Sequence, residues 1–372
     1  MNAAMEKLKH DPVPERKRQE FPTIQAGTKS LHAKTGVVVL TAAAVLVLLY
    51  VLWLGRTVLL LIFAGILLSV MLHSAASWLE RTLHIRRRWS LPLVVVAIAA
   101  ILGVGAWLRG PAIAAQIDQL QERLPQAAKS FVESVGAKDW GRWLVAHGFG
   151  PEHLPRAIDM LPRVTGALST TLGFLAGLVI IAFLGITIAA EPQTYRRGVE
   201  HLFPPSLRPD AVSVMEDLGR ALRTWLVARL ASMCAVGVMV TIGLLILRVP
   251  LAGTLGALAA LLTFIPNVGP FLSAIPPVLL AFGHSPRQAL LVILLFCAVH
   301  ALEGFFITPI AERAAVHLPP ALTLSAQLLL AVIVGPSGIA LAAPLTTVGM
   351  VLTRSIYLRK FLLADPFMRI VM

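Results

Sequence analysis

LAGTLGALAALLTFIPNVGPFLSAIPPVLLAF, residues 251–282, is the stretch that decides the fold. Its 32 residues carry no charge, and they exceed the about 20 that a helix needs to cross a bilayer. Proline and glycine interrupt the stretch at residues 265–270, where a helix loses its regular hydrogen bonds. Each arm is then about 12 to 15 residues, or roughly 20 Å, which is too short to cross alone. The stretch therefore predicts a membrane-embedded helix that is broken near its middle.

A second apolar stretch, residues 318–353, repeats this design with VGPSG at its centre. Free backbone carbonyls and amides at membrane depth are tolerated only where protein or a water-filled cavity covers them. Paired interrupted segments are therefore the best sequence pointer to a transporter's binding site, although two ordinary kinked helices are the alternative. The candidates for a substrate or ion pathway at the two breaks are Pro266, Asn267, Gly269, Pro270, Gly335, Pro336 and Gly338.

Two topologies fit these segments. Either each is one kinked span, or each is a re-entrant hairpin, the first opening outward near His284 and the second inward near Arg313. In the second case residues 289–307 cross between the hairpins. Arms of half-span length favour the hairpins, whereas the charges do not choose, because both topologies leave the C-terminus inside.

The rest of the chain is equally apolar. Hydrophobic residues make up 57% of the 372 residues and charged ones 14%, against about 45–50% and 25% in soluble domains. The composition predicts an all-α polytopic membrane protein with about eight transmembrane segments, two of them interrupted or re-entrant, plus a small external helical segment. The other runs without Asp, Glu, Lys or Arg are 35–54, 57–79, 90–108, 164–190 and 230–247.

Basic residues give the expected orientation. Seven precede the first run, and four follow the second, so both of these regions should be cytoplasmic, as should the C-terminus. We expect a multi-pass protein of a bacterial inner membrane. The net charge of +13 has this origin, so no nucleic-acid partner is expected. Two cysteines support neither a disulfide framework nor a metal site, and no cofactor is expected.

The predicted organisation follows from these runs. The external segment contains Ile113, Ile117, Leu120 and Leu124 at helical spacing, with Pro125 as a stop, and predicts an amphipathic helix on the membrane or on a partner subunit. The predicted parts are an N-terminus at 1–34, spans one to three at 35–108, the external segment at 109–163, span four at 164–190, a cytoplasmic amphipathic helix at 191–224, a core at 225–353 and a C-terminus at 354–372.

A few residues inside the spans stand out by their chemistry. Glu303 is a charged residue close to a span, and His300 lies on the same helical face. The two could carry a proton, hold a cation or contact a substrate; alternatively, Glu303 forms a structural ion pair with Arg229. In span four, Gly173 and Gly177 form a G-x-x-x-G pair, which favours close helix packing and allows a homo-oligomer.

The chain resembles the AI-2E family of bacterial membrane proteins, also called autoinducer-2 exporters or PerM-like permeases. The residues that carry the resemblance are IPNVGPFLSAIPPVLLA at 265–281 and EGFFITP at 303–309, followed by Leu318-Pro319-Pro320. The resemblance implies a permease without nucleotide-binding domains, with autoinducer-2 export or sodium/proton exchange proposed for members. Its motif residues here are Pro266, Gly269, Pro270, Pro276, Glu303, Gly304, Thr308 and Pro309.

Three function classes compete. The first is a permease for a small polar metabolite or ion, driven without ATP because no P-loop motif occurs. The second is a membrane scaffold or regulator without transport. The third, an intramembrane enzyme, is disfavoured because every Asp lies outside the predicted spans and no H-E-x-x-H or G-x-S-x-G motif is present. We therefore predict a permease and no enzyme.

Overall fold

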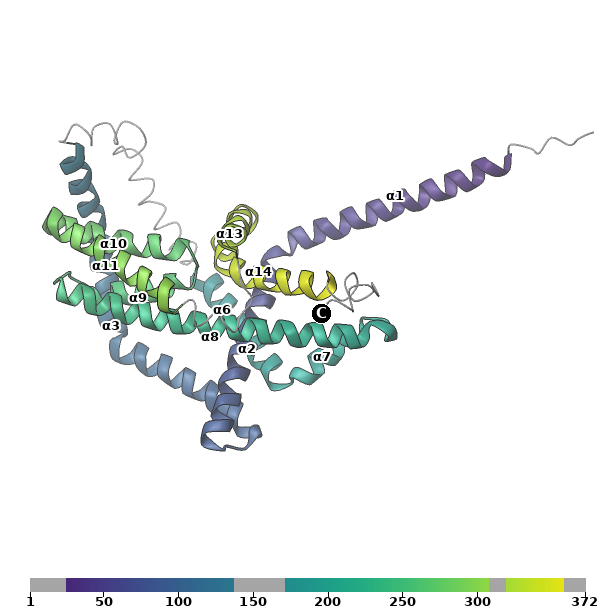
Figure 1. The fold of residues 1–372 in the computed structure, drawn as a ribbon, viewed down its shortest axis with the longest axis horizontal. Helices are drawn as coiled ribbons and strands as arrows, with labels where there is room; N and C mark the ends of the chain where they lie inside the picture. The colour runs from purple at the N-terminus through teal and green to yellow at the C-terminus, as the bar shows by residue number, and fades with distance from the viewer. Residues whose placement is uncertain (1–24, 137–170, 308–318, 358–372) are drawn as a thin grey trace, which may run out of the picture. The chain divides into compact units, whose positions relative to one another are not determined.

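The computed structural model describes residues 25–136, 171–307 and 319–357, and its regular structure there is helical (Figure 1). Thr308, the predicted hairpin opening near Arg313 and much of the predicted external segment lie outside these ranges. The chain divides into two units, residues 1–56 and 57–372, which are described separately. In the first unit, α1 (Gln25–Leu54) is a single helix whose side chains are exposed from residue 39 onward.

Helices α2 (Arg56–Leu83) and α6 (Thr171–Ala190) pack through glycines. A methyl group at Gly65 would lie 2.7 Å from Cβ of Leu184, and one at Gly185 would lie 2.7 Å from Cγ of Leu68. By contrast, Gly177 would meet Leu61 at an ordinary 3.7 Å, and Gly173 is exposed. The close approach of α2 and α6 is therefore at Gly65 and Gly185, and packing of another helix at Gly173 and Gly177 stays a prediction.

This contact can be tested by adding side-chain volume. Replacing Gly185 with alanine should destabilise the protein by about 1–3 kcal/mol, because the new methyl group would overlap Cβ of Leu68, which cannot move without the backbone. Thermal unfolding of the purified protein in detergent measures the change. Gly177→Ala is the matched control on the same helix and should be nearly neutral; equal losses in both variants would contradict the assignment.

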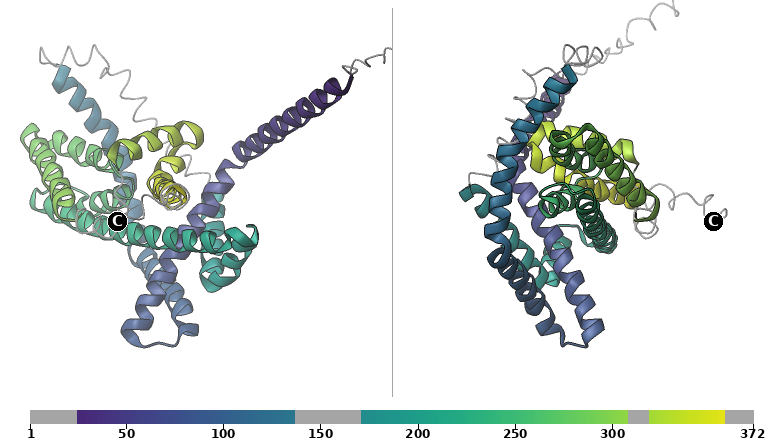
Figure 2. Two further views of the ribbon diagram at one scale, coloured as in Figure 1. Left: turned by 45° about the vertical axis from the view of Figure 1, so that its right-hand side comes forward. Right: turned by 90° about the vertical axis from the view of Figure 1, so that its left-hand side faces the viewer.

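Helix α3 (Arg87–Gly136) is far longer than predicted. It contains three prolines, including Pro125, and runs on past all of them, so the prediction that Pro125 ends a separate amphipathic helix is wrong (Figure 2). A proline removes one helical hydrogen bond, and a long helix can absorb this as a bend when its flanks are well packed.

The flank beyond Pro125 packs against the protein. Leu124 and Ala128 are buried, and the Phe131 ring meets Phe282 of α10 (Val268–His284) edge-on with centroids 4.9 Å apart. This part of the predicted external segment therefore covers a hairpin of the same chain.

The polar segment after α6 begins with a sharp bend. The helical axis turns by 88° between Leu175–Ala190 and α7 (Pro192–His201). A short turn, η2 (Pro205–Leu207), then leads into α8 (Arg208–Ile246), whose 39 residues correspond to about 58 Å. Pro209 lies in the first turn of α8, which suits proline's fixed φ.

The first interrupted segment folds into α9 (Ala252–Thr263) and α10 (Val268–His284), with a break at residues 264–267. In a straight helix Leu262 and Gly269 would be about 10 Å apart. Here the carbonyl oxygen of Leu262 occupies the place where a Gly269 side chain would stand, so the chain turns back on itself. The two segment ends meet in one core, because Ala252 and Ala281 belong to the same buried cluster. The segment is thus a hairpin and not a kinked rod.

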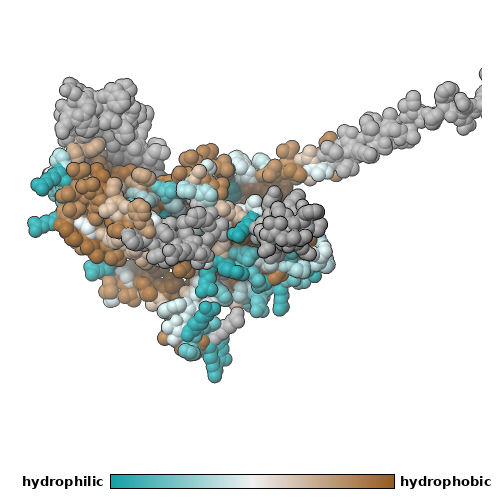
Figure 3. Space-filling model, in the orientation of Figure 1, coloured by the Kyte–Doolittle hydropathy of each residue, from teal (hydrophilic) through white to brown (hydrophobic). Residues whose placement is uncertain are grey.

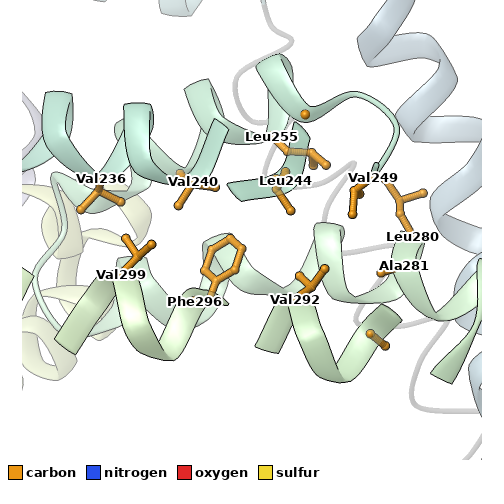
Figure 4. Close-up of a cluster of buried hydrophobic side chains, with 13 residues drawn as sticks. Val236, Val240, Leu244, Val249, Leu255, Leu280, Ala281, Val292, Phe296 and Val299 are labelled. Atoms are coloured by element: carbon orange, nitrogen blue, oxygen red, sulfur yellow. The ribbon is translucent and has the colours of Figure 1, made fainter. Parts of the chain in front are cut away.

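This core also includes α8 and α11 (Pro286–Leu302). Figure 4 shows side chains of α8 facing those of α11, with residues of α9 and α10 closing one end. The fully buried Val236, Val240 and Leu244 lie at a spacing of four, which gives α8 one continuous apolar stripe. Four consecutive helices are therefore held as one body around the break.

The second interrupted segment consists of α13 (Pro320–Val334) and α14 (Pro336–Tyr357). Leu330 and Gly338 would be about 12 Å apart in a straight helix, yet the Leu330 carbonyl oxygen contacts the Gly338 position, so this chain also turns sharply. Figure 1 shows α13 nearly end-on while α14 lies across the view. Unlike the first hairpin, one arm is of full span length, because α14 has 22 residues.

Within the described ranges, five helices are long and apolar enough to cross a membrane, or six if the bent pair formed by α6 and α7 is one span. Several shorter apolar helices add to these, and large apolar side chains such as Leu261 and Phe271 are exposed. Figure 3 shows apolar surface over the region of α10 and α11. Since such a surface needs hydrocarbon around it, the chain is a polytopic all-α membrane protein, as predicted.

Candidate functional site

Three polar side chains from three elements meet beside the first break. Nη1 of Arg229 on α8 lies 3.5 Å from Oε1 of Glu303, and Nδ1 of His300 on α11 lies 2.9 Å from Oε2 of Glu303. The side chains of Arg229, Glu303 and His300 are 15%, 9% and 17% exposed, so all three are largely removed from solvent. Glu303 thus contacts both side chains that the sequence analysis considered as its partners, the arginine and the histidine.

Local structure explains how Glu303 reaches this place. It caps α11 and begins a π-helical turn, η3 (Glu303–Ile307). A π turn inserts an extra residue into a helix, redirects the side chains around it and is frequent at functional sites. His300 and Glu303 therefore keep the helical i, i+3 contact predicted from their spacing, while the chain beyond leaves the α-helical path.

The backbone of the break is satisfied by side chains. Asn267 has φ +63°, which ends the helical hydrogen bonding between α9 and α10. Nε of Arg229 donates to the Phe264 carbonyl at 3.2 Å, and Nε2 of Gln327 donates to the Pro266 carbonyl at 2.8 Å. Protein therefore covers these two carbonyls, which is one of the two ways in which a break at membrane depth is tolerated, since helices α8 and α13 supply the missing donors.

Gln327 is the residue that the sequence analysis missed. It is 2% exposed, on α13, and it joins the second interrupted segment to the first. A search restricted to Asp, Glu, Lys and Arg passes over it; a large amide in an otherwise apolar run was the available signal, because a buried polar group needs partners.

Two buried polar atoms of this site have no hydrogen-bond partner among the described residues, His300 Nε2 and Gln327 Oε1. Unsatisfied buried polar atoms are uncommon in native proteins, and they indicate water, an ion or a ligand. Ser232, one turn after Arg229, is also buried and within hydrogen-bonding reach of Glu303. The residues together offer hydrogen-bond donors and acceptors around the broken hairpin.

The other predicted site residues are distributed as follows. Gly269 and Pro270 form the first turn of α10, where Gly269 allows close approach of the α9 backbone. Gly335, Pro336 and Gly338 form the second turn, which follows the C-terminal end of α13. Gly335 lies eight residues after Gln327, or about 12 Å along the helix. The second break therefore reaches the first through α13. Across the ranges that the structure describes, no group of three His, Cys, Asp or Glu side chains could hold a metal ion.

The structure combines a bundle of apolar helices, a broken hairpin and a charged cluster buried beside it. This combination is typical of membrane transport proteins. A family model described as AI-2E family transporter matches residues 42–357, and the chain belongs to this family.

Curated relatives agree with the family model. "Putative transport protein YueF" of Bacillus subtilis is 26% identical over 263 residues, covering 67% of this chain and 70% of that protein. "Putative transport protein YrrI" of Bacillus subtilis is 23% identical over 79% of this chain and 85% of its own length. "Putative transport protein YhhT" of Escherichia coli is 23% identical, with coverages of 85% and 90%. The family resemblance inferred from the motifs is confirmed.

Proposed function

We propose that the chain is a permease, not an enzyme, that moves a small polar metabolite or ion across a bacterial inner membrane without ATP, with both termini in the cytoplasm. Membership of a transporter family supports the class of activity. The observation that carries the site is the buried Arg229–Glu303–His300 cluster beside a broken hairpin. Export of an autoinducer-2-like compound and cation/proton exchange are the two candidate activities.

The physical case rests on cost. Placing ionised groups within a membrane is expensive, and such groups usually line a solute path or pair with one another. Glu303 does pair with Arg229, but the neighbouring His300 Nε2 and Gln327 Oε1 are buried without partners in the described chain. A cluster that served packing alone would be more stable with these atoms satisfied or replaced by apolar groups. The unsatisfied atoms favour a pathway over a scaffold.

The test is solute flux with matched variants. Sealed vesicles containing the purified protein are loaded with 22Na+ and a defined mixture of small polar metabolites, and release is followed by counting and mass spectrometry. Glu303→Gln should lower the flux by at least about tenfold, because it removes the charge that Arg229 and His300 contact. Glu200→Gln, at a half-buried position of α7 outside the cluster, should leave flux unchanged.

The scaffold alternative makes the opposite prediction. If the parent protein releases none of the loaded compounds faster than empty vesicles, or if Glu303→Gln releases them as fast as the parent while remaining folded, the proposed pathway is wrong. A deletion strain compared with its complemented parent in an uptake and efflux screen then widens the range of compounds.

A further inference from the structure

Apart from α14, helix α13 makes few contacts with the described chain. It packs along α14, and Thr323 and Gln327 are its buried residues. Leu328, Leu329 and Val332 are exposed by 70%, 61% and 87%. Thr323 donates to Pro319, within its own end of the segment, so the hydrogen bond from Gln327 to Pro266 is the polar link from α13 to the broken hairpin.

The orientation of the Gln327 amide is fixed by chemistry. A backbone carbonyl only accepts hydrogen bonds, so the amide nitrogen must face the Pro266 oxygen and Oε1 must point elsewhere. Oε1 is buried and has no donor within the described residues. A side chain retained only to fasten two helices permanently gains little from one bond while its second polar atom is unsatisfied.

The other end of α13 has the geometry of a hinge. Gly335 alone separates α13 from α14, and its φ of +85° and ψ of −151° fall in a region that is essentially restricted to glycine. No atom outside its immediate chain neighbours lies within 4 Å of the position where its side chain would be. Gly335 is therefore not enclosed by side chains, and a rotation there would change mainly the packing of α13 along α14.

We propose that α13 is a hinged arm and that Gln327 is the positioning residue that latches it onto the hairpin break. When the bond between Gln327 and Pro266 opens, α13 turns about Gly335 and exposes a carbonyl acceptor and an amide to the pathway. This deepens the proposed function, on which it rests, by naming the part that moves in the transport cycle.

The test measures the distance between the arm and the hairpin. Cys234 and Cys297 are replaced by alanine, and spin labels are attached at Leu322→Cys, near the end of α13 far from Gly335, and at Phe271→Cys on α10, both of which are exposed. In lipid nanodiscs the parent should show one main distance. Gln327→Met, which keeps side-chain length but removes the donor, should increase the ratio of a second, displaced population about fivefold, because that is the usual effect of losing one buried hydrogen bond.

Two further variants make the result specific. Gln327→Leu removes both polar groups of the amide, including the donor, so it should also release the arm, and it serves if the methionine variant does not fold. Thr323→Val removes a buried hydroxyl from the same helix without touching the latch and should resemble the parent. Parent-like distances in both Gln327 variants, or equal displacement in Thr323→Val, would overturn the proposal. A Glu303→Gln variant with the same flux as the parent would overturn the proposed function instead. The two failures can be told apart, because they use different variants and different measurements.

Discussion

Replacing Glu303 with leucine should destabilise the protein by about 3–5 kcal/mol, because it leaves the buried Arg229 guanidinium without its carboxylate. Arginine does not escape this cost by becoming neutral, because its guanidinium stays charged in proteins. The bond from Arg229 to the Phe264 carbonyl remains, but a neutral carbonyl does not balance a charge. Denaturant titration of the purified protein in detergent measures the loss in the free energy of unfolding.

A double-mutant cycle separates the ion pair from general damage. Arg229→Met combined with Glu303→Leu should be more stable than Glu303→Leu alone, because neither charge is then buried unpaired. Recovery should be incomplete, since the Phe264 carbonyl loses its donor. Additive losses in the double variant would show that Arg229 and Glu303 do not interact, and the site described here would be incorrect.

Gly269→Ala should destabilise the protein by at least about 3 kcal/mol, beyond the usual range for an added methylene. The new methyl group would overlap the carbonyl oxygen of Leu262, a backbone atom that cannot rotate away as a side chain does. The hairpin turn between α9 and α10 would have to open.

The matched control for this prediction lies in the same hairpin. Gly253, in the first turn of α9, has no atom within 4 Å of its side-chain position. Gly253→Ala should therefore be neutral or slightly stabilising, because alanine favours the helix by up to about 1 kcal/mol over glycine. Thermal unfolding of both variants decides: equal stability of Gly269→Ala and Gly253→Ala would mean that the two arms are not folded back on each other.

The sequence predicted the fold class and the first break because both follow from strong local signals. A long charge-free apolar run is not stable in water. Pro266 and Gly269 interrupt the helical hydrogen bonds of such a run in any tertiary context. The helical spacing of His300 and Glu303 likewise fixed their contact in advance. These are properties of one segment, and they do not depend on its neighbours.

The errors all involve tertiary packing. Pro125 was predicted to end a helix, but buried contacts of Leu124 and Ala128 support α3 through it. The close approach at Gly65 and Gly185 involves two helices that lie more than a hundred residues apart in the sequence, and no sequence motif indicates it. Gln327 was missed for the same reason, because its partner, the Pro266 carbonyl, is identified only once α13 is placed beside the break.

The central claim is that the break between α9 and α10 lines a water-filled path and is not sealed in lipid. In a background without Cys234 and Cys297, Ile265→Cys in the break and Leu261→Cys on the 66%-exposed surface of α9 are treated with a membrane-impermeant thiol reagent in intact vesicles. We expect the cysteine at position 265 to react and the one at 261 not to react, since in the proposed pathway the first faces water and the second faces hydrocarbon. No reaction at 265, with the protein folded and the thiol titratable after denaturation, would contradict it.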